Sequence, residues 1–226
     1  MYFGHFAVAV AIKAKEPKVP TLPIFIGVCF LDILNAFFIL IGISRVSPNL
    51  EALPYLFYNL DYIDWDHSLT MALVWSFLWG ASFLKDKKIA LIAFLAAFSH
   101  FLIDWPMHNS DLALYPNSHL HFGLGLWGKM GIWAWVGEIF FSGILLIYAW
   151  QKSTTYRNNL KWQIIFLCLL ASQLSPWLSP MKFAATLSEP YAHLMHAYLM
   201  FAGFLVPPGI FIWLDSLSKK EKKDPI

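Results

Sequence analysis

The chain has 226 residues, of which 58% are hydrophobic and 13% charged, with a net charge of +2 and a mean hydropathy of +0.57. Such a composition is too apolar for a soluble domain of this length and is typical of a protein with several membrane spans. The sequence has no basic patch, which excludes nucleic acid as a partner. Cys29 and Cys168 both lie in apolar runs, which excludes a disulfide framework and a thiolate metal site.

The first apolar stretch is too short to cross a bilayer. Residues 2–12 would form a helix of about 16 Å, roughly half the hydrocarbon thickness, so we expect a re-entrant or interfacial segment. Six longer apolar runs follow at 20–44, 67–84, 89–105, 128–150, 160–178 and 190–214. The predicted fold class is therefore all-α, with about six transmembrane helices and a short N-terminal helix in one integral membrane domain, 1–226.

The basic residues are distributed unevenly between the two sets of connections. Thirteen of the 16 Lys and Arg residues fall in the segments 13–18, 85–88, 152–161 and 219–223. The opposite set contains only Arg45, Lys129 and Lys182. By the positive-inside rule, we expect a multi-pass protein of the inner (plasma) membrane with both termini in the cytoplasm.

Several ionisable side chains fall within the predicted spans, in the half away from the basic side. Asp32 lies about 21 Å along a helix from Lys18, at ~1.5 Å per residue. By the same rise, Glu138 lies about 16 Å below the outer end of its own span. His67 opens another span, and Asp66 is placed to cap it. Buried ionisable groups cost several kcal/mol in a membrane, so they are expected to face a cavity or a partner.

The stretch "FSHFLIDWPMHNSD" at 98–111 concentrates such groups. His100 and Asp104 are four residues apart and share one helical face. Pro106 favours the end of the helix, so His108 and Asp111 belong to a turn that can fold back over that face. Neutral imidazole and carboxylate are the ligands that Zn²⁺, Fe²⁺ and Mn²⁺ accept, and a cation would compensate the buried negative charge.

Four other histidines have no assigned role. His119 and His121 alternate in an expected loop, where they either face a substrate or are simply exposed. His193 and His196 are three residues apart near the outer end of the last span, a spacing that suits a metal pair, but the only carboxylate beside them is Glu189.

The order of these motifs resembles the membrane-bound metal-dependent hydrolases of bacterial inner membranes. The matching motifs are Gly4-His5, Asp32, His67-Ser68, and Ser99-His100 with Asp104. A subgroup of integral membrane proteins with the longer pattern "SHxxxDxxxHxxDLxLxP…GLGLW…E" is more similar still; here that pattern ends at Glu138. The resemblance covers roughly residues 4–140. The family's "PDxD" is "LDIL" around Asp32, so a second ligand is absent there, although Asn35 one turn later can partly replace it.

The resemblance implies a divalent-metal site with hydrolytic chemistry. We expect zinc, or alternatively iron or manganese, to be bound by His5, Asp32, His67, His100, Asp104 and His108. The metal would lower the pKa of its water toward ~7, and Glu138 or Asp111 would accept the proton. Because the site opens among acyl chains, the expected substrate is a membrane lipid or a lipid-linked ester or phosphoester.

Two other hypotheses use the same residues. A transporter, or a carrier of metal ions or protons, would also place carboxylates and imidazoles within its spans. A third reading is purely structural, in which the polar groups hold the helices together without any metal.

Overall fold

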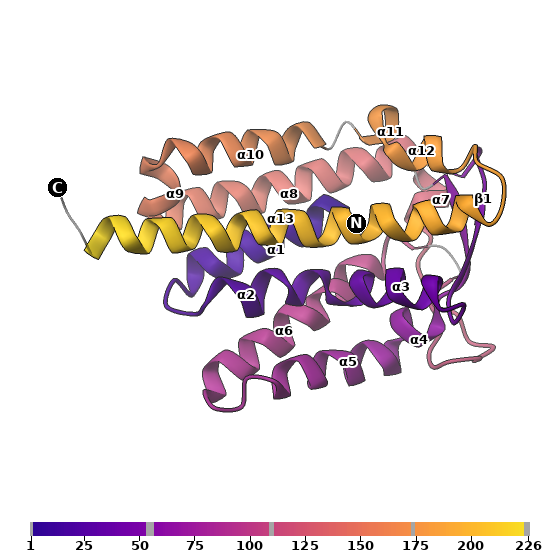
Figure 1. Ribbon diagram of the computed structural model, residues 1–226, viewed down its shortest axis with the longest axis horizontal. Helices are drawn as coiled ribbons and strands as arrows, with labels where there is room; N and C mark the ends of the chain where they lie inside the picture. Colours follow the sequence, from indigo (N-terminus) through magenta and orange to yellow (C-terminus); the bar gives the residue numbers. More distant parts are fainter. Residues whose placement is uncertain (1, 53–56, 109–110, 173–174, 224–226) are drawn as a thin grey trace.

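Most helices of the bundle run along one common direction (Figure 1). The computed structural model describes residues 2–52, 57–108, 111–172 and 175–223. The longer helices are α1 (Tyr2–Lys15), α3 (Phe30–Leu40), α5 (Leu69–Ala81), α6 (Lys87–Asp104), α8 (Ile132–Lys152), α10 (Leu160–Ser172) and α13 (Tyr191–Lys223). The short ones are α2 (Thr21–Phe25), α4 (Asp64–His67), α7 (Leu126–Met130), α9 (Thr154–Asn158), α11 (Ser175–Leu178) and α12 (Pro180–Ala184). The all-α prediction is confirmed apart from one small β-hairpin.

The two ends of the bundle differ in structure (Figure 1). The connections α1–α2, α5–α6 and α8–α9–α10 lie at one end, together with the C-terminal end of α13. These are the segments in which the sequence concentrates its Lys and Arg. The other end carries α4, α7, α11, α12 and the antiparallel strands β1 (Arg45–Pro48) and β2 (Tyr58–Tyr62).

Three helical segments within the described residues are long and apolar enough to cross a membrane, namely Thr21–Leu40, Ile132–Lys152 and Tyr191–Leu217. The predicted count of six spans is not supported. Helices α5 and α10 have 13 residues each, which is about 20 Å at ~1.5 Å per residue and less than the hydrocarbon thickness. Helix α6 has 18 residues but includes Lys87, Lys88 and Asp104. Residues 173 and 174 of the predicted span 160–178 lie outside the described residues.

Large apolar side chains point outward from the bundle. Phe77 of α5 is 65% exposed, Phe140 of α8 is 72% exposed and Leu167 of α10 is 65% exposed. Apolar surface of this extent is unfavourable in water but is normal against lipid tails. Together with the three apolar segments, it is consistent with a membrane protein.

Helix α1 is short, with 14 residues, and most of its side chains are buried inside the bundle. Its first turn lies beside the middle of two long helices, because Tyr2 donates a hydrogen bond to the Gly203 carbonyl (3.1 Å) and the Phe3 amide donates one to Glu138 Oε1 (3.1 Å). The prediction that puts the N-terminus at the cytoplasmic end is therefore not supported.

The other end of α1 is fixed by a buried lysine. Lys13 Nζ donates to the Val19 carbonyl (2.7 Å) and lies 3.6 Å from Asp215 Oδ2 of α13. Asp215 also accepts a hydrogen bond from Thr21 at the start of α2 (2.6 Å). Both ends of α1 are thus tied to neighbouring helices, which sets the depth of every side chain along it.

The apolar segment Thr21–Leu40 is not one continuous α-helix, because its regular structure is interrupted beside the buried His100. Between α2 and α3, residues Gly27–Cys29 form a single 3-10 turn. A Cβ at Gly27 would lie 2.9 Å from Trp79 Nε1, so glycine permits the close approach of α5. The carbonyl of Val28, in this turn, accepts a hydrogen bond from His100. The break in regular helix therefore provides a backbone acceptor at the site.

Packing of α5 against α6 depends on Gly80. A Cβ there would lie 2.9 Å from both the Ala90 carbonyl oxygen and Phe94 Cβ. We expect Gly80→Ala to push the two helices apart and to destabilise the protein by about 1–3 kcal/mol, as overpacking does. Thermal unfolding in detergent measures this. Gly143→Ala on α8 is the control, because nothing lies within 4 Å of its Cβ position; equal melting of the two variants would contradict the packing argument.

Candidate metal centre

The structure brings together all six predicted metal ligands. His5 comes from α1, Asp32 from α3, His67 from α4, His100 and Asp104 from α6, and His108 from the turn that follows. Each of these residues is more than nine-tenths buried. Two subsets have ligand atoms that all lie within 4.8 Å of one another: His5, Asp32 and His100, and His67, His100 and Asp104. His/Asp groups able to hold a metal ion are therefore present.

His100 Nε2 is the centre of this arrangement. It lies 3.2 Å from His67 Nε2, 3.5 Å from Asp32 Oδ2 and 3.1 Å from Asp104 Oδ2. His67 Nε2 is also 3.5 Å from Asp32 Oδ1. In a tetrahedral site with bonds of about 2.0–2.2 Å, neighbouring ligand atoms lie ~3.3–3.6 Å apart. These four separations are close to the spacing expected for two ligands that share a cation.

Hydrogen bonds on the far side of each ring determine which nitrogen carries the proton. His100 Nδ1 lies 2.7 Å from the Val28 carbonyl, which can only accept, so Nδ1 is the protonated nitrogen. His67 Nδ1 lies 2.5 Å from Asp66 Oδ1. The two Nε2 atoms that face each other at 3.2 Å are then both lone-pair atoms in the neutral rings. Two lone pairs at this distance repel unless a cation or an added proton lies between them.

Asp66 is itself held in place from two sides. Its Oδ1 accepts a hydrogen bond from Asn35 (3.0 Å) and its Oδ2 accepts one from Ser44 (2.6 Å). Burial raises the pKa of Asp66, but its hydrogen bonds, including that with His67, oppose this shift and favour the carboxylate. The prediction that Asp66 caps the following helix is wrong, because Ser68 accepts from the Met71 amide and caps α5 instead.

His108 repeats the same arrangement beside Asp104. Its Nδ1 lies 3.1 Å from Asp111 Oδ2, and its Nε2 lies 3.6 Å from Asp104 Oδ2. Burial alone raises the pKa of Asp111, but the charge and the hydrogen bond of His108 outweigh burial and hold that pKa below its usual value. Asp111 thus orients an imidazole ring, an arrangement that typically raises the affinity of histidine for a metal.

His5 of α1 contacts both His100 and Asp104. Its ring stacks on that of His100, with centroids 3.8 Å apart, and its Nε2 lies 3.4 Å from Asp104 Oδ1. Neither nitrogen of His5 has a hydrogen-bond partner among the described residues, although the ring is 1% exposed. Asp104 therefore faces His5 with one oxygen and His100 and His108 with the other.

The two predicted proton acceptors, Glu138 and Asp111, are separated from the cavity by the predicted ligands. Glu138 Oε1 accepts from the amides of Phe3 (3.1 Å) and Gly4 (3.4 Å), at the start of α1. Asp111 borders a separate surface hollow at the hairpin end of the bundle. Within the described part of the chain, neither residue lines the cavity at the centre. Their contacts fit the positioning of His5 and His108.

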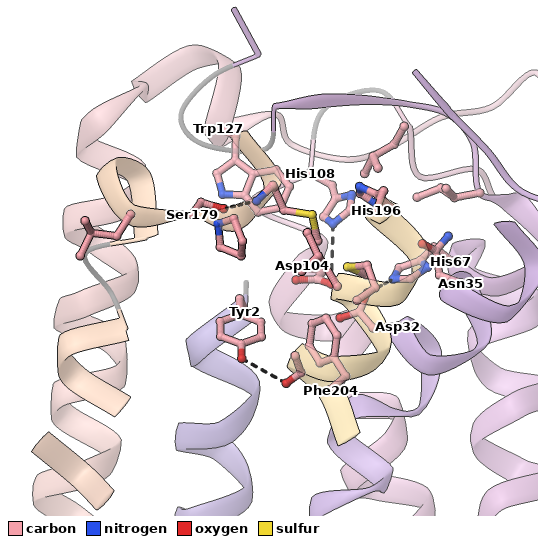
Figure 2. A pocket seen from close by; sticks show the side chains of 18 of the residues that line it. Tyr2, Asp32, Asn35, His67, Asp104, His108, Trp127, Ser179, His196 and Phe204 are labelled. Atoms are coloured by element: carbon pink, nitrogen blue, oxygen red, sulfur yellow. Dashed lines mark hydrogen bonds and ion pairs between the residues drawn. The ribbon is translucent and has the colours of Figure 1, made fainter. Parts of the chain in front are cut away.

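A cavity of about 410 Å³ opens beside the centre. Figure 2 shows Asp32, His67, Asp104 and His108 gathered on one side of it, with Tyr2 and Phe204 below them. The rest of the wall is largely apolar and includes Leu199 and Met200 of α13 and Met181 of α12. The centre is therefore buried in protein yet accessible to a molecule in the cavity.

Of the four histidines without an assigned role, three are at least partly exposed and one is buried beside the cavity. His119 and His121 are exposed and do not line the cavity. His193 is partly exposed and contacts Glu189 Oε2 through Nδ1 (2.6 Å). His196, by contrast, is buried and lines the cavity. Its sequence context, an apolar helix with no matching motif, contained no signal that separated it from His193.

Comparison with models of protein families, with curated proteins and with solved structures finds no match for this chain. The resemblance to membrane-bound metal-dependent hydrolases therefore stays a prediction. The functional argument rests on the geometry of the centre.

Removal of the Asp66 carboxylate tests whether the acceptors behind the histidine rings contribute to metal affinity. We expect Asp66→Ala to weaken Zn²⁺ binding by about 10–100-fold, because His67 would lose the group that fixes its tautomer and orientation. Titration of chelator-treated protein against a chromophoric zinc indicator measures the affinity. Asp61→Ala is the control, since Asp61 is exposed in the same connection. Unchanged affinity in a folded Asp66→Ala protein would contradict this account.

Proposed function

We propose that this chain is a membrane-embedded, divalent-metal-dependent hydrolase that acts on a lipid or on a lipid-linked ester or phosphoester. The observation that carries the proposal is the 3.2 Å approach of His67 Nε2 to His100 Nε2, with both Nδ1 atoms already engaged by acceptors. Asp32 and Asp104 add negative charge at the same point. A divalent cation removes the lone-pair repulsion and compensates the two carboxylates together.

The donor set fits such a cation. His67, His100, Asp32 and Asp104 would bind it, and His5 and His108, on either side of Asp104, would complete the coordination or hold a second cation. Zinc accepts this mixture of nitrogen and oxygen, as do iron(II) and manganese(II). Such a cation, when bound, acidifies a water molecule and polarises an ester or phosphoryl oxygen.

Residues around the centre prepare it for this chemistry. Val28, Asp66 and Asp111 hold three imidazole rings with Nε2 pointing inward, so little reorganisation is needed on binding. Hydrolysis joins the water oxygen to the carbonyl carbon or phosphorus and breaks the bond to the alcohol oxygen, which takes up a proton. The cavity beside Asp32 and Asp104 is where the reacting group of the substrate would lie.

The cavity wall supports a lipid-like substrate. Beyond the polar side, its wall is formed by apolar side chains such as Leu199, Met200 and Met181. No Lys or Arg is found among the described residues that line it. An anionic head group would therefore be neutralised by the metal rather than by the protein, and a neutral ester would suit the cavity equally well.

The membrane orientation belongs to the same proposal. We place the basic end of the bundle in the cytoplasm of a cell whose inner membrane holds the chain, on the positive-inside rule. In this orientation the metal centre lies in the outer half of the bilayer.

One observation favours a second candidate function, transport of protons or metal ions. An unbroken series of side chains joins Asp111 to Asp66, in which successive ring nitrogens and carboxylate oxygens lie 3.6 Å apart or less. The series is Asp111, His108, Asp104, His100, His67 and Asp66. Such a row can relay protons as well as bind a metal.

Substitution of the central ligands separates these functions. We expect purified protein to contain a stoichiometric transition metal, and His100→Ala or Asp104→Ala to lose it along with hydrolysis of a lipid panel. Elemental analysis and thin-layer chromatography of the lipids measure the two properties. His121→Ala should keep both, because that side chain is exposed and outside the cavity. Metal-containing protein that hydrolyses no lipid but carries ions across liposomes would establish the transport alternative. Metal-free protein would overturn the hydrolase and metal transport, and metal-free protein that also carries no protons would overturn the remaining candidate.

Substitution of Glu138 tests which group accepts the proton of the attacking water. Gln keeps an oxygen that accepts from Phe3 and Gly4, so we expect Glu138→Gln to retain metal and hydrolysis within a few-fold, and Glu138→Leu to lose both through displacement of α1. If Glu138 accepts the proton from water, Glu138→Gln will instead lower the hydrolysis rate by about 10²–10⁴-fold with its metal retained.

A further inference from the structure

His196 is a buried histidine that the metal centre does not use. It lies on α13, is 5% exposed, and lines the same cavity as Asp32, Asp104 and His108 (Figure 2). Neither of its ring nitrogens has a hydrogen-bond partner among the described residues. An unpaired polar group away from water is costly, so something that enters the cavity is expected to satisfy it.

The ring of His196 is held by packing rather than by hydrogen bonds. Its centroid lies 4.3 Å from that of Tyr58 on β2. The Tyr58 hydroxyl donates to the Ala192 carbonyl one turn earlier on α13 (2.9 Å), which fixes the tyrosine against this helix. The position of the imidazole is therefore set in advance, while its nitrogens stay available.

The same face of α13 continues as an apolar wall. His196, Leu199, Met200, Gly203 and Phe204 have the i, i+3, i+4, i+7, i+8 spacing of one helical face, and all of them line the cavity. Leu178 and Met181, from the α11–α12 segment, also line it. The cavity thus combines the ring of His196 and the metal centre with an apolar surface.

We propose that His196 is a substrate-binding residue, which donates a ring N–H hydrogen bond to an oxygen of the substrate's head group. The head group lies between His196 and the metal centre, and the acyl chain lies against the apolar residues of α13 and α11–α12. This inference rests on the proposed function and adds its substrate contact: the ligand is a single-chain amphiphile, gripped by the metal at one oxygen and by His196 at another.

Binding to simple amphiphiles tests the inference without any measure of turnover. Full-length protein in maltoside micelles is loaded with Zn²⁺ and titrated calorimetrically with dodecyl phosphate and with glycerol monolaurate. We expect His196→Ala to weaken the binding of at least one of them by about tenfold, the usual loss for one hydrogen bond to a buried group. Zinc content and melting temperature should not change, and His196→Gln, which keeps an N–H donor, should recover part of the affinity.

His193→Ala is the matched control, because His193 lies one turn away on α13 but contacts Glu189 and not the cavity. It should bind both amphiphiles as the wild type does. Inorganic phosphate is titrated in parallel; if it binds as tightly as dodecyl phosphate, the apolar wall contributes nothing and the amphiphile assignment is overturned.

Three results would overturn the role of His196 and leave the metal centre in place. The His196→Ala variant could bind both amphiphiles as tightly as the wild type, or it could lose its zinc. The third is that the zinc-loaded wild type binds neither amphiphile. A wild type that binds no metal would overturn the proposed function itself. The two failures are therefore distinguishable.

Discussion

Two imidazole nitrogens that face each other at 3.2 Å in an apolar bundle impose the condition on which the rest of the structure depends, because a proton or a cation has to lie between them. Neither ring can turn its protonated nitrogen inward, because Val28 and Asp66 already hold the Nδ1 sides. Carboxylates at 3.1 and 3.5 Å from His100 Nε2 make the point strongly attractive to a cation. Without positive charge there, repulsion between the lone pairs and the desolvation of the carboxylates would both oppose folding.

Irregular backbone is what delivers the acceptors. The 3-10 turn Gly27–Cys29 brings the Val28 carbonyl to His100, and the short helix α4 places Asp66 directly beside His67. The turn after α6 does the same for His108 and Asp111. A regular helix would use the Val28 carbonyl internally, so the departure from regularity there coincides with the site, as it often does in membrane proteins.

Helix α1 brings the predicted ligand His5 to the middle of the bundle. A 14-residue helix cannot span a bilayer, but with its first turn at Glu138 and its last at Asp215 it carries His5 to the level of His100. The start of α1 also presents amide N–H groups within the apolar interior, and Glu138 satisfies two of them. A carboxylate predicted to take part in chemistry thereby has a structural explanation as well.

Composition and spacing were sufficient to predict a helical membrane protein, because apolar content and the distribution of Lys and Arg are properties of the chain that need no partner. Spacing alone put His100 and Asp104 on one helical face, whereas the full set of six ligands was named only together with the family resemblance. The number of spans did not follow, because α5 and α10 are shorter than their apolar runs suggest. Only the tertiary structure decided which acceptor lies beside Nδ1 of His67 and of His100, the distinction between His196 and His193, and the position of Glu138 at the start of α1. Each of these depends on which atom of a distant segment lies within hydrogen-bonding distance, and helical periodicity relates only residues of the same helix.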